Sequence, residues 1–599
     1  MAAILLAVLA LPAGAAARAD LVLHDGVVWT GDDDAPAAQA VAIAGDRIAA
    51  VGPDAAVMRH AGPRTRVLDL NGAFVAPAFA DQHVHVLEDP TMSSLRPSWS
   101  GYDPAAAEAF RAAILGYHSG LFAARRTPED GCTTSTVTES LKNDLAAAQE
   151  ELARQGIGSV VEAGLSDLAV LEALRQLERE GRMRVRFLVR VGWGCIEQAA
   201  AMGLRTGSGS EWTRILGVKL YSDGWLGPRS AALREPYGDR PHDGYLFLDQ
   251  DRANADVARA RQLGFNVTTH AIGDRGLATT LAAYRANGVT KTDRYSVEHA
   301  QVLGEDLIAE MERLGVVASI QLSFATTDQR FAESALGPER AARSYAWRTL
   351  DQRGIRLAGG SDFPVEVVTP LWGLQRVVTR REFDGTPPGG WHPDQRFDVP
   401  RALRLITADD AYASLEDRRR GRVEAGRFAD LVVVRENLLE LPQDCIAAAT
   451  VLLTVVNGRV TFEGEQAYPP GDATCPSGRA PAKEPRIAPG AALRDGRAPR
   501  VSLKVGGPSA RGLRRARRLR VAVRVDEPAT AAVRMRVGGA PIVRRRGIRI
   551  ASPGRRTVTV ALTRRARRAL RRGGRLAVSA RAVDAAGNAG AARAVRRLR

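Results

Sequence analysis

The sequence has no long apolar run beyond its first segment, which excludes membrane-spanning helices from the rest of the chain. That first segment, MAAILLAVLALPAGAAARAD, is broken by Pro12 and is too short to cross a bilayer as a helix. Small residues follow it, and Ala17-Arg18-Ala19 fits the A-x-A pattern of a cleavage site. We predict a signal peptide over 1–19 and a secreted or cell-envelope location. The alternative is the alanine-rich N-terminus of a cytosolic protein.

Cysteine is scarce, and its four residues have no spacing typical of a zinc site, which argues against a cysteine-ligated metal. In an exported protein four cysteines can form disulfides, with three possible pairings. Cys445 and Cys475 both lie in a polar region and are the expected pair. Cys132 and Cys195 lie near predicted strands of the chain's central part, where we expect buried thiols.

Acidic residues are nearly absent from the last hundred positions. Residues 501–599 hold 28 Lys and Arg but only 3 Asp and Glu, a net charge of +25. Residues 1–500 hold 56 basic and 64 acidic residues, a net charge of −8. The excess charge therefore predicts an anionic partner, such as a cell-surface polymer, for the terminal module alone. The alternative is an ordinary solvated face whose arginines reflect genome composition.

The central part of the chain alternates short apolar strands with helical patterns, as βα units around a parallel sheet do. Eight such strands predict an α/β fold, a (β/α)8 TIM-like barrel over 77–405, with its chemistry at the carboxyl ends of the strands. The expected strands cover 74–81, 158–164, 185–192, 215–222, 265–270, 295–299, 316–322 and 355–361.

Strand-rich segments flank this barrel on both sides. Residues 20–76 and 406–466 contain short strands separated by Gly and Asp, which predicts one composite β-sandwich built from both ends. Residues 467–499 are rich in Pro, Gly and Ala and are typical of a linker. Residues 500–599 contain five or six short alternating runs, which predict a basic, all-β, immunoglobulin-like sandwich.

Polar side chains follow several barrel strands where each strand ends, and four of the nine histidines are among them. His83 and His85 end the first strand, His270 the fifth and His299 the sixth. Neutral imidazole is a good zinc ligand. Asp362 ends the eighth strand, beside the first in a closed barrel, where a carboxylate can accept a proton from a metal-activated water. The pattern predicts a metal-dependent hydrolase.

Lys219 ends the fourth strand, between the two groups of histidines. A lysine there can take up carbon dioxide and form a carbamate that bridges two cations. The alternative is an ordinary barrel lysine that pairs with a carboxylate such as Asp223.

The sequence resembles the amidohydrolase superfamily, family 3, in its YtcJ-like branch, which includes N-substituted formamide deformylases. Six fragments carry the resemblance over about residues 20–465: FVAPAFADQHVH (74–85), GVKLYSDGWLGPRSAALREPY (217–237), THAIGDRG (269–276), VEHAQ (297–301), GGSDFPVEVVTPLWGLQ (359–375) and GRVEAGRFADLVVV (421–434). The resemblance implies hydrolysis of an amide, formamide or cyclic-amide C–N bond in a small molecule.

Carried over by position, the resemblance implies a complete ligand set for one or two divalent ions, with zinc expected. The ligands are His83, His85, Lys219, His270, His299 and Asp362, and Asp362 is also the catalytic base. Asp223, Arg229 and Gln321 are candidate substrate-binding residues; Arg229 could equally form a surface salt bridge. The chain departs from the family at Ala80-Asp81-Gln82, where Ile-Asp-Ser is usual, and at Leu322, where proline is usual.

Two other functions remain open from the sequence. A deaminase of a nitrogen heterocycle would use the same site. A wall-associated protein with an inactive barrel would instead bind polyanions through its arginine-rich module.

Overall fold

The computed structural model describes residues 18–87 and 131–466, together with the backbone of seven strands between 501 and 598. Contacts divide the chain into two compact units, residues 1–488 and 489–599. Residues 1–17 of the predicted signal peptide and the predicted linker over 467–499 lie outside the described residues. In the part that is described, no helix is both long and apolar enough to cross a membrane.

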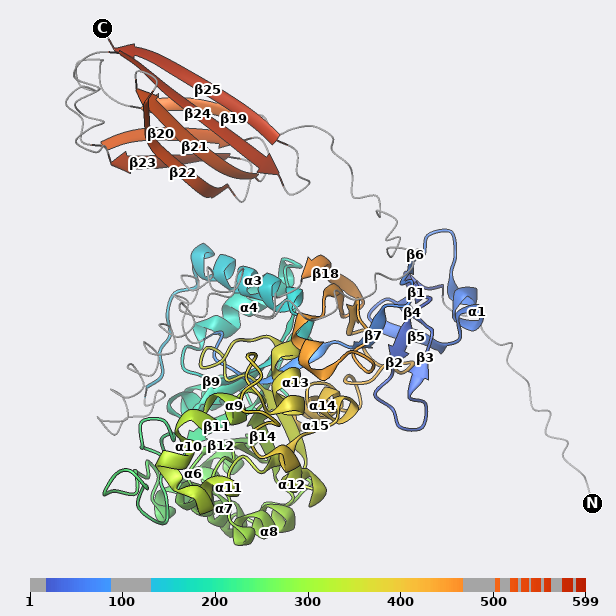
Figure 1. Cartoon of the computed structure of the whole chain (residues 1–599), viewed down its shortest axis with the longest axis vertical. Helices are drawn as coiled ribbons and strands as arrows, with labels where there is room; N and C mark the ends of the chain where they lie inside the picture. Colours follow the sequence, from blue (N-terminus) through green and yellow to red (C-terminus); the bar gives the residue numbers. More distant parts are fainter. Residues whose placement is uncertain are drawn as a thin grey trace, which may run out of the picture. The chain divides into compact units, whose positions relative to one another are not determined.

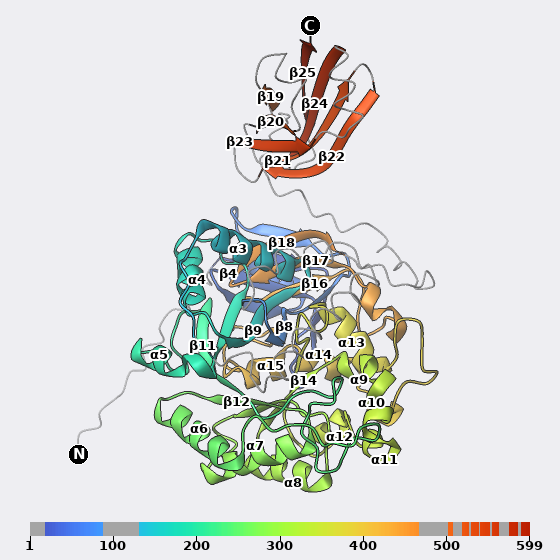
Figure 2. The ribbon, with the colours of Figure 1, turned by 90° about the vertical axis from the view of Figure 1, so that its left-hand side faces the viewer.

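Eight parallel strands form the barrel that the sequence predicts, so the (β/α)8 fold class is confirmed (Figures 1 and 2). The strands follow one another in chain order, and the last closes on the first because the His85 N–H donates to the Phe363 carbonyl over 2.7 Å. The strands are β8 (Phe79–Val84), β9 (Ile157–Leu165), β10 (Arg186–Gly192), β11 (Thr213–Tyr221), β12 (Val267–Ala271), β13 (Ser296–His299), β14 (Val317–Gln321) and β15 (Leu357–Gly360).

Helices lie outside these strands and begin where the sequence supplies a cap. The Thr138 side chain accepts the Leu141 N–H ahead of the first of them, and Asp249 accepts the Arg252 N–H ahead of another. Each turns an apolar face to the barrel wall, where leucines and valines are buried. These helices include α3 (Glu139–Arg154), α4 (Ala169–Arg179), α6 (Gln250–Gln262), α7 (Asp274–Ala286), α8 (Glu305–Leu314), α13 (Pro370–Thr379) and α15 (Ala408–Ala413).

Strands from both sides of the barrel meet in two further sheets. One joins β5 (Arg47–Gly52), β4 (Ala40–Ala44), β1 (Leu21–His24) and β6 (Arg66–Asp69). The other joins β18 (Arg459–Gln466), β17 (Val451–Val456), β16 (Leu431–Val434), β7 (Phe74–Pro77), β2 (Val27–Trp29) and β3 (Ala37–Ala38). Because β7 pairs with β16, segments more than 350 residues apart share one apolar core.

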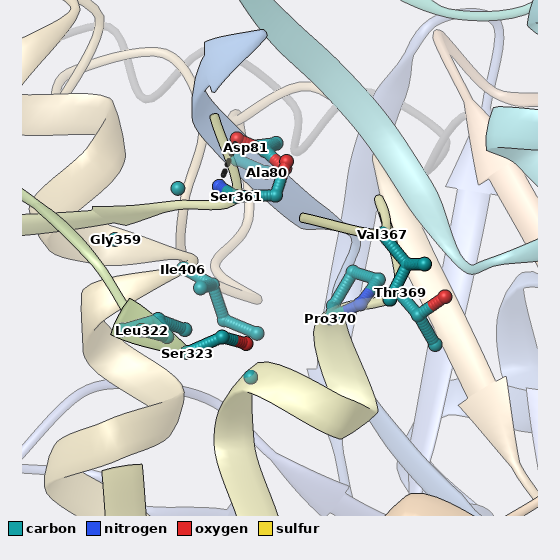
Figure 3. Close-up of a pocket in the computed structure, with 12 residues that line it drawn as sticks. Ala80, Asp81, Leu322, Ser323, Gly359, Ser361, Val367, Thr369, Pro370 and Ile406 are labelled. Carbon is teal, nitrogen blue, oxygen red and sulfur yellow. Dashed lines mark hydrogen bonds between the residues drawn. The ribbon is translucent and has the colours of Figure 1, made fainter. Parts of the chain in front are cut away.

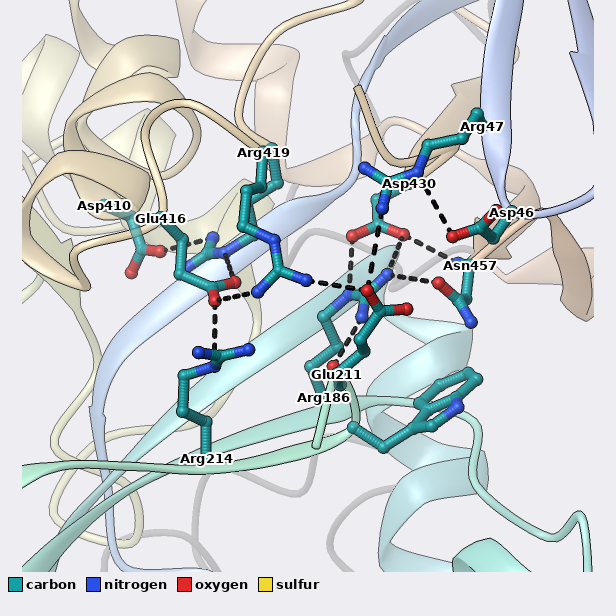
Figure 4. A network of polar contacts seen from close by, with 12 residues as sticks. Asp46, Arg47, Arg186, Glu211, Arg214, Asp410, Glu416, Arg419, Asp430 and Asn457 are labelled. Atoms are coloured by element: carbon teal, nitrogen blue, oxygen red, sulfur yellow. Dashed lines mark hydrogen bonds and ion pairs between the residues drawn. The ribbon is translucent and has the colours of Figure 1, made fainter. Parts of the chain in front are cut away.

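A buried ionic network fastens this sandwich to the barrel (Figure 4). Arg186, at the start of β10, donates to both carboxylate oxygens of Asp430 over 2.8 and 3.0 Å, and to Asn457 over 2.9 Å. A bidentate guanidinium–carboxylate pair that is also bonded to a third group compensates the cost of burying its charges. The sandwich is therefore fixed to the barrel at the amino end of β10, away from the carboxyl strand ends where the predicted ligands lie.

The cysteine prediction is partly wrong. Cys132 and Cys195, expected as buried thiols, form a disulfide with their Cα atoms 4.7 Å apart. The two segments meet because Cys195 follows β10, while the chain ahead of α3 runs beside the end of β9 through a bridge between Thr133 and Asp167. Cys445 is also disulfide-bonded, and its expected partner, Cys475, lies outside the described residues.

The second unit consists of two antiparallel sheets. One contains β19 (Val501–Gly506), β20 (Arg518–Val525) and β23 (Gly554–Ala561). The other contains, in spatial order, β22 (Ala540–Ile550), β21 (Ala529–Val537), β24 (Gly574–Asp584) and β25 (Ala589–Leu598). The unit is all-β, and its assignment to the immunoglobulin-like class stays a prediction.

Candidate metal centre

The ends of β8 and β15 bring two histidines and one aspartate together. The pairing of β8 with β9 shifts register between Asp81 and Val84, which interrupts the strict alternation of side chains along the strand. The Nε2 atoms of His83 and His85 each lie 3.3 Å from Oδ1 of Asp362. Three of the predicted ligands are therefore neighbours.

Asp362 is held in place by the backbone that surrounds it. It has a φ of 60°, in the left-handed region, and its N–H donates to the His83 carbonyl over 2.8 Å. Burial raises the pKa of the Asp362 carboxyl, but the nearby imidazoles of His83, His85 and His299 outweigh burial and bring the pKa well below its ordinary value. The carboxylate is ionised, the form that ligates a cation and accepts a proton.

His299 and His270 come from adjacent strands and complete the imidazole cluster. Their ring centroids are 4.5 Å apart, and the His299 ring is 5.1 Å from that of His83. Nδ1 of His299 lies 4.0 Å from Oδ2 of Asp362. Burial lowers the pKa of His299 to about 3 and that of His270 well below its ordinary value. Both rings are therefore neutral, as metal ligands must be.

Lys219 is fully buried in β11 and lies against the first histidine. Its Nζ is 3.4 Å from Nε2 of His83, 3.3 Å from the Ala163 carbonyl and 4.7 Å from the centre of the Tyr221 ring. Asp223, the alternative partner for this lysine, is occupied by three backbone N–H groups instead. The amino group of Lys219 thus lies between β9, β11 and the histidine cluster.

The donor set fits a divalent cation such as zinc. One ligand atom from each of His83, His299 and Asp362 lies within 4.8 Å of the others. Two neutral imidazoles and an ionised carboxylate are the nitrogen and oxygen donors that zinc prefers. His85, His270 and Lys219 border this group, so all six predicted ligands lie at one rim.

One residue from each departure from the family pattern, Ala80 and Leu322, lines the same pocket (Figure 3). Ala80 and Asp81 of β8 line the pocket together with Leu322, and Pro370 and Gly373 of α13 also border it. Asp81 is buried, and its Oδ1 accepts the N–H groups of His83 and Ser361 over 3.1 and 2.9 Å. Burial raises the pKa of Asp81 to about 7. This side chain ties the backbone of a ligand on β8 to the residue that precedes Asp362.

The candidate substrate-binding residues differ in their surroundings. Asp223 is buried and anchors the loop after β11 to the start of α7, and burial raises its pKa to about 7. Arg229 forms an ion pair with Asp239 at 2.6 Å. Gln321 is buried in the site, where its Oε1 accepts the Nδ1–H of His299 over 2.7 Å. Its Nε2 has no hydrogen-bond partner among the described residues.

Glu298, which the sequence pattern did not predict as a site residue, contacts the predicted ligand His83 directly. The Nδ1–H of His83 donates to its Oε2 over 2.7 Å, while the Thr268 hydroxyl donates to its Oε1 over 2.7 Å. Burial raises the pKa of Glu298, but His83, Arg190 and Lys219 outweigh burial and bring it below its ordinary value. An ionised carboxylate that accepts the Nδ1–H keeps Nε2 of His83 unprotonated, as a nitrogen that ligates a cation must be.

A closed (β/α)8 barrel with neutral histidines and an ionised aspartate at one rim defines a metal-dependent hydrolase. The family model described as "Amidohydrolase family" matches residues 103–462, more than half of the chain. The chain therefore belongs to the amidohydrolase family, whose members are hydrolases of carbon–nitrogen bonds.

Individual relatives agree with this assignment. The chain is 31% identical to the putative amidohydrolase YtcJ of Bacillus subtilis over 41% of its own length, and the match spans about half (47%) of that protein. It is 22% identical to the N-substituted formamide deformylase of Arthrobacter pascens, over 74% of this chain and 98% of that protein. An uncharacterized metal-dependent hydrolase from Pyrococcus furiosus has the same fold, with a TM-score of 0.57, 24% identity, and coverage of 70% of this chain and 100% of the other.

Proposed function

We propose that the protein hydrolyses the C–N bond of an amide, formamide or cyclic amide in a small molecule. The observation that carries the proposal is the ionised Asp362 carboxylate, whose Oδ1 lies 3.3 Å from the Nε2 atoms of His83 and His85, two of the predicted ligands. The name of the Arthrobacter pascens relative supports N-substituted formamides as the first substrates to test.

Different residues of the site have different roles in the proposed reaction. A divalent ion at His83, His299 and Asp362 would polarise the substrate carbonyl and activate water. Asp362 accepts the proton of the attacking water and returns it to the departing nitrogen. The unpartnered Nε2 of Gln321 can donate to a substrate oxygen, while Glu298 keeps His83 oriented. Zinc is the proposed metal because the donors are imidazole nitrogens and a carboxylate.

A substrate screen of the zinc-loaded protein tests this function. N-substituted formamides, N-acyl amino acids and cyclic ureides are incubated with protein, and formate, free amine, carboxylate and ammonia are quantified separately. Release of an amine with formate or another carboxylate supports the proposal. Release of ammonia from a heterocycle whose ring stays intact would establish a deaminase instead. No turnover of any substrate by metal-loaded, folded protein would favour the inactive barrel.

Lys219 provides a separate prediction, because its Nζ lies 3.4 Å from a ligand nitrogen and is fully buried. We propose that its neutral amine adds to carbon dioxide, forming an N–C bond and releasing one proton, so that the carbamate holds a second cation. Lys219→Ala is expected to lose activity by at least about 10²-fold, and short carboxylic acids should restore part of it. A variant with full activity and one bound ion would contradict the carbamate.

We further propose that the protein is exported. The support is the apolar first segment and the A-x-A pattern at 17–19. N-terminal sequencing of protein recovered from the culture medium or cell envelope is expected to begin at Asp20. Protein that stays in the cytosol with its first residues intact would contradict export. Export would place the basic residues of 501–599 where they can meet an anionic surface polymer.

A further inference from the structure

Strand register in the second unit places eight arginines on one face of one sheet. Residues directly opposite each other in an antiparallel sheet share a face, and so do alternate residues along a strand. The pairs Arg534 with Arg544, Arg534 with Ser579, and Ser579 with Arg593 therefore define a single row across all four strands. The face as a whole contains Arg534, Arg536, Arg544, Arg549, Arg575, Arg581, Arg593 and Arg597, and we call it the arginine face.

The two faces of this sheet differ sharply in composition. The register positions that share the arginine face include no Asp or Glu. The opposite face of the two central strands carries Val533, Met535, Val578 and other apolar or small residues, with Asp584 at the end of a strand. Among the register positions of this sheet, the sequence pattern therefore makes the arginine face, and not the apolar one, the candidate for binding a charged partner.

Like charges stand directly opposite each other on this face. Arg534 pairs with Arg544, and Arg575 pairs with Arg597. Such cross-strand pairs cost stability unless an anion lies between them. On the arginine face a bound polyanion would offset this cost at both pairs.

The absence of aromatic residues restricts the classes of partner that this unit can bind. Residues 501–599 contain no Phe, Tyr or Trp. Recognition of single-stranded nucleic acid depends on stacking of bases on aromatic side chains, and membrane interfaces favour Trp and Tyr. All basic residues on the face are arginine, whose planar fork matches phosphate oxygens better than lysine does.

We propose that the arginine face binds a linear, phosphate-bearing polymer without bases, of the kind found in a cell wall. Neighbouring strands are about 4.8 Å apart and alternate residues along a strand about 6.8 Å apart, so the face offers a grid of charges to an extended chain. Binding through phosphates releases counterions and therefore weakens steeply with salt. This inference is independent of the hydrolytic function.

Two matched variants of the full-length protein test the proposal, with long-chain inorganic polyphosphate as the probe. The first replaces Arg534, Arg544, Arg581 and Arg593 by glutamine. The control replaces Lys504, Arg520, Arg524 and Arg555, which share one face of the other sheet and also include a directly opposed pair, Arg524 with Arg555. Both remove four charges, so a partner that senses only net charge cannot distinguish them.

The arginine-face variant is expected to bind polyphosphate at least about 10-fold more weakly at 0.15 M salt, and the control less than about 3-fold. Polyphosphate should also raise the melting temperature of the wild-type module and not that of the variant. If the quadruple variant loses its far-UV circular dichroism, Arg534→Gln alone replaces it, with an expected 2- to 3-fold loss. Equal losses in variant and control, or tighter binding of an oligothymidine of equal charge, would overturn the proposal.

Discussion

Replacing Asp362 by asparagine is expected to lower kcat/KM by at least about 10³-fold in zinc-loaded protein. Removal of a general base costs about 10²- to 10⁴-fold, and this carboxylate also lies 3.3 Å from the Nε2 atoms of the predicted ligands His83 and His85. Asparagine keeps the size of the side chain but cannot accept the proton of water. Steady-state kinetics on the substrate found by the screen measures the loss.

Asp306→Asn is the matched control for this loss. Asp306 pairs with Arg234 at 2.7 Å on the exposed surface, where an ion pair contributes about 0–1 kcal/mol. The control is expected to keep wild-type kinetics and zinc content. If Asp362→Asn retained more than about a tenth of the wild-type kcat/KM, Asp362 would not be the base, and another group would have to accept the proton.

The barrel could be predicted because several of the apolar runs that form its strands end at a polar residue of the predicted site. Each predicted ligand stands where an apolar run ends, and parallel strands bring such ends to one rim. The first predicted strand, 74–81, nevertheless joined two elements. The chain leaves the sandwich after β7 and enters the barrel with β8, and between them the Ala78 N–H donates to the Asp430 carbonyl. A continuous apolar run gives no sign of that change of sheet.

Glu298 was not predicted as a site residue, and the reason is physical. Strict alternation would put it and His299 on opposite faces of their strand, so only one would be assigned to the site. His299 has a φ of 77°, outside the β region, and this turn lets both residues reach the cluster. The Cys132–Cys195 disulfide was missed because its two segments, 63 residues apart, meet only through the packing of the barrel rim.

Replacing Glu298 by glutamine is expected to raise the zinc dissociation constant by about 10- to 100-fold. The negative charge on Oε2, 2.7 Å from Nδ1 of His83, makes the opposite ring nitrogen a stronger ligand, and a neutral amide provides this less well. Competition with a chromogenic chelator measures the constant without reference to catalysis. The neutral partner of His299 gives the comparison: Gln321→Ala should weaken zinc binding less, because no charge is lost there.

Thr268→Val tests whether the charge of Glu298 affects zinc binding while its hydrogen bond to His83 is kept. The substitution keeps the shape of the side chain and removes the hydroxyl that donates to Oε1 of Glu298 over 2.7 Å, while the bond to His83 stays. A buried carboxylate that loses one of two partners becomes easier to protonate. The zinc dissociation constant of this variant is therefore expected to lie between those of the wild type and Glu298→Gln. Zinc binding that is unchanged in both variants would mean that the cation does not depend on the orientation of His83, and the ligand set would then have to centre on His270 and His299.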